Sequence, residues 1–117
     1  MKKSRKIYSI DEIKEKTKDV FEKYRIKKAY VFGSYARGEA TQKSDIDIEI
    51  VRRGSDIKSL LNLADFEEDL EKALDKCVDV ITQETYTEQT KGDNKYGKLA
   101  KKLFYDEVKK DRREIFG

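Results

Sequence analysis

Apolar residues recur along the chain with two periods, one typical of helices and one typical of strands. Spacings of three and four predict amphipathic helices, whereas strict alternation predicts half-buried strands. By these criteria we expect helices at residues 10–24, 34–39, 56–75 and 97–110, and strands at 29–32, 45–52 and 78–81. Residues 113–116 are candidates for a last edge strand. The alternation of helices and strands predicts an α/β or α+β fold built around one small sheet.

The same patterns predict which side chains form the core. Ser9 or Asp11 is expected to cap the first helix. The helix over 56–75 is expected to turn inward Ile57, Leu60, Leu61, Ala64, Leu70, Ala73 and Leu74. The helix over 97–110 is expected to bury Leu99, Leu103, Phe104 and Val108. Residues 82–97 are polar and lack clear periodicity, so they are expected to form a mobile loop with at most a helical turn.

Length and composition narrow the class of protein. The 117 residues are expected to form a single domain over 1–117, and 44% of them are charged. No apolar run approaches the length of a membrane span, and no secretory signal is expected. Cys77 is the only cysteine, which fits a reducing cytoplasm, and it is expected to be a small buried group. Histidine is absent, which excludes Ser-His-Asp and Cys-His catalysis.

The net charge of +3 is distributed unevenly. Residues 1–28 carry eleven Lys/Arg and five Asp/Glu, for a net +6, and residues 91–117 carry nine and five, for a net +4. Residues 29–90 carry seven and fourteen, for a net −7. The acidic centre suits a cation site, and the basic flanks suit an acidic partner or a polyanion. The simpler interpretation is that these charges are solvated helix faces.

A turn that could receive phosphate follows the strand at 29–32. Gly33 lets the backbone approach an oxyanion closely, and Ser34 offers a hydroxyl and an N–H. Arg37 either pairs with a phosphate or lies on the surface. Ser44 either donates to phosphate or caps the entry to the next strand. The sequence does not separate these alternatives.

Three aspartates are stronger evidence for a functional site than the turn residues are. Asp45 and Asp47 alternate with isoleucines in the strand at 45–52, where aspartate is disfavoured, and a strand places both on one face. Asp79 lies centrally in an apolar strand, where a buried carboxylate is costly unless it is paired or bound to metal. The alternative is an aspartate on an edge strand that faces water. Mg²⁺ prefers such oxygen ligands, and two ions can hold a triphosphate for in-line displacement. Glu49 is expected to face solvent or to support this site.

Together these residues resemble a known signature. Gly33-Ser34, ten residues, then Asp45-Ile46-Asp47 is similar to the signature of the DNA polymerase β-type nucleotidyltransferase superfamily, and the length resembles its minimal prokaryotic members. The resemblance implies a small mixed sheet flanked by helices. It also implies that Gly33 and Ser34 contact the triphosphate of ATP, and that Asp45, Asp47 and Asp79 are the magnesium ligands and base.

The resemblance also implies a function and a partner. Many minimal members are antitoxins of a toxin with the higher eukaryotes and prokaryotes nucleotide-binding (HEPN) fold, and some transfer AMP from ATP to tyrosines of that toxin. We therefore expect a Mg²⁺-dependent transfer of AMP to a protein hydroxyl. The alternative is a binding module that neutralises the toxin by occlusion. Transfer to an antibiotic or an RNA end is less favoured, and neither self-association nor a hetero-complex is excluded.

Overall fold

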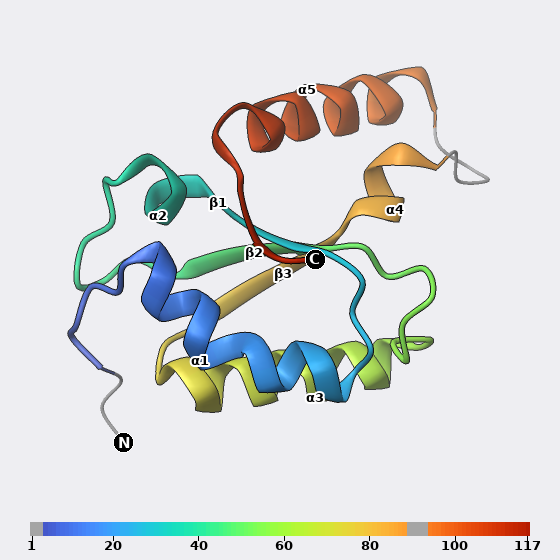
Figure 1. The fold of residues 1–117 in the computed structure, drawn as a ribbon. Coiled ribbons are helices and arrows are strands. Elements are labelled where there is room, and N and C mark those ends of the chain that lie inside the picture. The colour runs from blue at the N-terminus through green and yellow to red at the C-terminus, as the bar shows by residue number, and fades with distance from the viewer. Residues whose placement is uncertain (1–3, 89–93) are drawn as a thin grey trace.

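One four-stranded sheet organises the protein. The computed structural model describes residues 4–88 and 94–117, and its strands are β1 (Ala29–Phe32), β2 (Ile46–Ile50), β3 (Val78–Thr82) and β4 (Arg113–Phe116). They lie in the order β3-β2-β1-β4 (Figure 1). β1 is antiparallel to both β2 and β4, whereas β2 and β3 are parallel, so the sheet is mixed as expected. The edge strand predicted at 113–116 is confirmed.

Two long helices cover one face of the sheet. They are α1 (Ile10–Lys23) and α3 (Leu60–Leu74), which pack against each other below the strands in Figure 1. Between them and the sheet lie the fully buried Ile46, Ile48 and Ile50 of β2. Ser9 caps α1 through a capping box with Glu12, as one of the two predicted caps. The alternation in β2 is what directs its isoleucines to this core.

The opposite face is covered less completely. It carries α5 (Lys95–Asp111) and the short helix α4 (Gln83–Thr87), with α5 above the sheet in Figure 1. The short helix α2 (Gly33–Arg37) follows β1, and its buried Tyr35 and Ala36 join the core on the α1 side. A second, smaller cluster of Phe32, Tyr105 and Val108 holds α5 to the strands. Within residues 82–97, α4 corresponds to the predicted helical turn, and residues 89–93 of that prediction lie outside the described ranges. None of the described helices is long and apolar enough to cross a membrane.

The predicted start of the third helix, α3, was wrong. α3 begins at Leu60 with Ser59 as its cap, not near residue 56. Ser55 instead stabilises a turn, because its hydroxyl donates to the Arg52 carbonyl and accepts from the Ile57 N–H. In α3 the buried residues are Phe66, Leu70 and Leu74, so Leu60 and Leu61 are 84% and 75% exposed and Ala64 is exposed too, contrary to the prediction.

The burial predicted for three residues of α5 and for Cys77 was also wrong. Leu99, Leu103 and Phe104 of α5 are exposed, because Tyr105 and Val108 turn the other side of the helix to the sheet. Cys77 is exposed, because it precedes the edge strand β3 rather than entering the core. Of the two alternatives for Glu49, the structure excludes the solvent-facing one, because this side chain is fully buried under α5.

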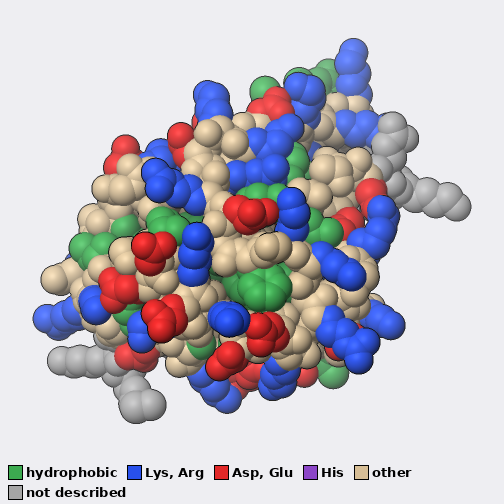
Figure 2. Space-filling model, viewed as in Figure 1, with side chains coloured by type: hydrophobic (Ala, Val, Ile, Leu, Met, Phe, Trp, Pro, Cys, Tyr) green, Lys and Arg blue, Asp and Glu red, His purple; other side chains and the backbone are tan. Residues whose placement is uncertain are grey.

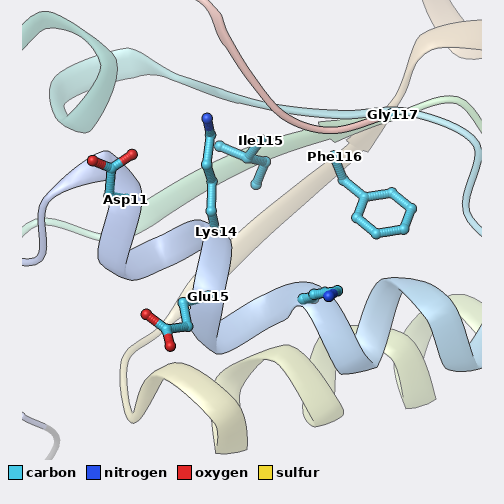
Figure 3. A pocket seen from close by; sticks show the side chains of 7 residues that line it. Asp11, Lys14, Glu15, Ile115, Phe116 and Gly117 are labelled. Atoms are coloured by element: carbon cyan, nitrogen blue, oxygen red, sulfur yellow. The ribbon is translucent and has the colours of Figure 1, made fainter.

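The two edges of the sheet differ. At β3, α3 covers part of the edge: the Val78 N–H donates to the Glu71 carboxylate at 3.1 Å. At β4, the edge instead borders a cavity of about 480 Å³ against α1. Figure 3 shows Lys14 of α1 extending beside Ile115 of β4 in this cavity.

Candidate active site

The turn from β1 into α2 is shaped by Gly33. Its φ is +70°, in the left-handed region that side chains rarely adopt. A Cβ at this position would also overlap the Asp47 carboxylate and would lie 3.3 Å from its Cγ. Two independent constraints therefore require glycine here. The consequence is that the Gly33 backbone lies directly against the carboxylate of the neighbouring strand.

The strand register brings the predicted acidic residues to the same place. Phe32, the residue before the turn, pairs with Asp47 of β2, and Asp47 pairs in turn with Asp79 of β3. Asp45 immediately precedes β2 and is exposed. Asp79 is exposed on an edge strand, which is the alternative to a buried aspartate, and it lies beside Asp47 as expected. The turn and the carboxylates thus meet at one end of the sheet, on the face that carries α5.

At this end of the sheet, the folded protein disfavours the ionised form of the carboxylates. Burial of the half-buried Asp47, together with the carboxylates of Asp79 and Asp45, raises the pKa of Asp47 to about 6, against a smaller opposing effect of Arg37. Burial, then the carboxylates of Glu71 and Asp79, also raise the pKa of Glu67. A cation placed among these oxygens would relieve both effects.

The donor set fits a divalent cation. Carboxylate oxygens are the ligands that Mg²⁺ prefers, and Asp45, Asp47 and Asp79 interact electrostatically. In the described part of the chain, however, no three such side chains are already gathered closely enough to hold a metal ion. The residues therefore match Mg²⁺ in chemistry and in charge, and their side chains would have to close around the ion.

The other predicted phosphate contacts have protein partners in this structure. Arg37 is exposed and its Nε lies 3.1 Å from a Glu39 carboxylate oxygen. The Ser44 hydroxyl accepts a hydrogen bond from the Thr41 N–H at 2.8 Å, which stabilises the turn before β2. Ser34 is half-buried in the first turn of α2. Of this group, Ser34 is adjacent to Gly33 and remains a predicted triphosphate contact.

A buried charged network supports the same face and was missed by the sequence reasoning. Arg112 Nη1 lies 2.8 and 3.0 Å from the two carboxylate oxygens of Glu49, and it donates to the Tyr105 hydroxyl at 3.0 Å. Tyr105 donates to Glu49, as does Gln83 Nε2 at 3.2 Å. Burial, followed by the Glu49 hydrogen bond, raises the pKa of Tyr105.

This network joins elements that are far apart in sequence. The Arg112 guanidinium also lies 4.2 Å from the ring centroid of Tyr30 in β1, a cation–π contact. Glu49 follows Asp47 by two residues on the same face of β2. The network therefore fixes the C-terminal end of α5 over the strands that carry the acidic residues. The alternation of β2 placed Glu49 on this face, and only the covering helix was unpredictable.

The aromatic residues around the turn pack in the protein interior. Phe32 and Tyr35 are buried, and burial raises the pKa of Tyr35. The cavity beside β4 is lined by neither Gly33 nor any of the three aspartates. Asp45 and Asp79 are exposed, so the predicted site lies at the surface, at the end of the sheet.

Comparison with known proteins agrees with the fold and the signature. The family described as Polymerase beta, Nucleotidyltransferase matches residues 15–110. The Methanocaldococcus jannaschii protein MJ0435, provisionally named a protein adenylyltransferase, is 47% identical over 74 residues, which are 63% of this chain and 77% of the relative. The protein adenylyltransferase MntA of Thermococcus cleftensis is 41% identical over 64 residues, 55% of this chain and 63% of the relative. This chain therefore belongs to the polymerase beta nucleotidyltransferase family.

Solved structures show the same fold. A chain in a toxin–antitoxin crystal structure with AMP-PNP aligns with a TM-score of 0.64 and 20% identity, covering 89% of this chain and 73% of that one. A chain of the MntA–HpeT toxin–antitoxin complex aligns with a TM-score of 0.62 and 18% identity, covering the same shares. At this identity the likeness concerns the fold, and it confirms the polymerase β-like architecture expected from the signature.

Proposed function

We propose that this protein is an antitoxin that transfers AMP from ATP to a hydroxyl of a toxin protein, with Mg²⁺ as cofactor. The observation that carries the proposal is the register that places Asp47 between the Gly33 turn and Asp79. The names of the relatives, which are protein adenylyltransferases, support the reaction class. The fold neighbours come from toxin–antitoxin complexes, which supports the kind of partner, and a HEPN-type toxin with an acceptor tyrosine is the partner that the signature implies.

In the proposed reaction, Asp45, Asp47 and Asp79 would hold magnesium, and the Gly33-Ser34 turn would receive the triphosphate. Bound magnesium would neutralise charge on the phosphates and lower the pKa of the attacking hydroxyl. The acceptor oxygen forms a bond to the α-phosphorus of ATP, the bond to the bridging oxygen breaks, and pyrophosphate leaves. Asp79 is exposed at the edge of the sheet, where an incoming hydroxyl could deliver its proton to it.

Arg37 and Ser44 complete the proposal as secondary contacts. Arg37 would leave Glu39 to pair with a phosphate, an exchange that is feasible because both side chains are largely exposed. Ser44 would act through the turn that it caps, just before Asp45. Substituting either residue should therefore weaken ATP binding less than substituting Ser34.

The experiment uses ATP labelled at the α-phosphate, magnesium, and the protein encoded by the neighbouring reading frame. We expect label on that protein at a tyrosine, identified by mass spectrometry, and its loss with Asp45→Asn/Asp47→Asn or with a chelator. Asp19→Asn, on an exposed position of α1, is the matched control. A complex that forms but acquires no label would contradict the proposed reaction.

One observation favours the alternative of neutralisation by occlusion. The exposed apolar residues of α5 offer a binding surface that does not require catalysis. Under this alternative, Asp45→Asn/Asp47→Asn still protects cells from the toxin at equal protein abundance. Under the catalytic proposal, the same variant binds the toxin but fails to protect.

A further inference from the structure

The helix α5 has two apolar faces. Its inner face holds Tyr105 and Val108 against Phe32 of the sheet. Its outer face carries three large apolar side chains that are 52–79% exposed: Tyr96, Leu99 and Leu103. Tyr96, Leu99 and Leu103 are spaced by three and four residues, so they form one stripe along the helix. A surface helix ordinarily shows one such stripe, and the second is left without a partner within the described chain.

The charges beside the outer face all have one sign. Residues 95–104 contain four lysines and no aspartate or glutamate. Lys95, Lys98 and Lys102 are exposed and follow the stripe at the same helical spacing. Lys102 pairs with Asp106, one turn beyond the stripe, at 3.0 Å. Figure 2 shows hydrophobic side chains beside lysine and arginine along the top of the molecule, where Figure 1 places α5.

This pattern argues against a second copy of the chain as the occupant. In a symmetric dimer whose two stripes cover each other, the lysine border of one α5 would face residues 95–104 of the other, which contain no aspartate or glutamate. A partner that supplies carboxylates beside an apolar stripe would satisfy both features. A helix is the element whose stripe matches this spacing, by ridges-into-grooves packing.

We propose that the outer face of α5 docks an amphipathic helix of the toxin whose apolar stripe is bordered by aspartate or glutamate. This inference rests on the proposed function, because it takes the toxin to be the partner. α5 lies on the face of the sheet that carries Asp47 and Asp79, so a toxin docked there is held on the side of the acidic site. The stripe would thus recruit the acceptor, while the aspartates act on it.

The test measures binding of the neighbouring-frame protein by isothermal titration calorimetry. Leu99→Glu/Leu103→Glu places two charges in the stripe at exposed positions, and we expect it to weaken binding by about tenfold or more. The matched control is Leu60→Glu/Leu61→Glu on α3, which makes the same charge change at positions of greater exposure and should bind as the wild type does. Lys95→Glu/Lys98→Glu should also weaken binding and reduce its dependence on salt.

The outcomes separate this inference from the proposed function. Equal weakening by the stripe and control variants, or no binding by the wild-type protein, would overturn the docking proposal. A dimer of the free protein, or binding to vesicles containing anionic lipid, would also overturn it if the stripe variant alone abolished that behaviour. Asp45→Asn/Asp47→Asn should bind normally. Stripe-dependent binding without transfer of label would refute the reaction and leave the docking surface standing.

Discussion

Replacing Asp47 with asparagine removes a charge that the folded protein accommodates poorly. The folded-state pKa of about 6 lies above the ordinary 3.8, so the folded state holds this proton more tightly than the unfolded chain does. Stability is therefore lost as the pH rises from about 4 to about 6, and the loss is complete above that window. Asparagine, which is nearly isosteric and uncharged, avoids the loss.

The magnitude follows from the same two pKa values. The difference between 3.8 and about 6 corresponds to at most about 3 kcal/mol. Because Asp47 is only half-buried, solvent screening reduces this to about 1–2 kcal/mol. We expect Asp47→Asn to unfold at higher urea than the wild type at neutral pH without magnesium, by that free energy. The same variant should lose transferase activity.

Urea unfolding from about pH 4 to about pH 7.5, with chelator present, checks this prediction. The stabilisation should shrink toward zero as the pH falls to about 4, and magnesium should stabilise the wild type but not the variant. Asp19→Asn should show neither effect. If Asp47→Asn is no more stable than the wild type at neutral pH, or if the gain does not depend on pH, then burial and the neighbouring carboxylates do not destabilise the charged form of Asp47.

Gly33→Ala should lower the free energy of unfolding by about 1 kcal/mol more than Gly38→Ala does. Both residues have positive φ, but only at Gly33 would the added Cβ meet a carboxylate. Thermal unfolding of the two variants measures the difference. Arg112→Met should cost about 3 kcal/mol by leaving the buried Glu49 without its cation, and adding Glu49→Gln should recover a substantial part of this in a double-mutant cycle. Phe66→Ala should cost about 3–5 kcal/mol in urea unfolding, since its ring is fully buried, and a loss below about 1 kcal/mol would contradict the observed position of α3.

The sequence predicted the local order of elements and the acidic end of the sheet, because alternation and glycine chemistry are local signals. It did not predict what covers each surface. Glu49 was correctly placed on the face of Asp47, but its burial depends on Arg112, which lies 63 residues away. In α5, the sequence pattern alone does not show which of two apolar stripes is buried. The stripe that contains Tyr105 is the buried one, because Tyr105 contacts Glu49. Which surface of an element is covered depends on contacts with residues far away in the sequence, and the spacing of apolar residues carries no information about them.

The two edges of the sheet differ in whether a helix carboxylate occupies their backbone N–H groups, and this difference affects how two molecules could join. Along β3, the Val78 N–H is occupied by the Glu71 carboxylate of α3, which obstructs pairing with an incoming strand. Among the described residues, no carboxylate accepts a hydrogen bond from a β4 N–H in this way, although α1 contacts the strand. An edge-to-edge contact of two molecules therefore favours β4 from both partners. The resulting continuous sheet then has β3 at each end, so growth stops at a pair and cannot propagate into a fibre.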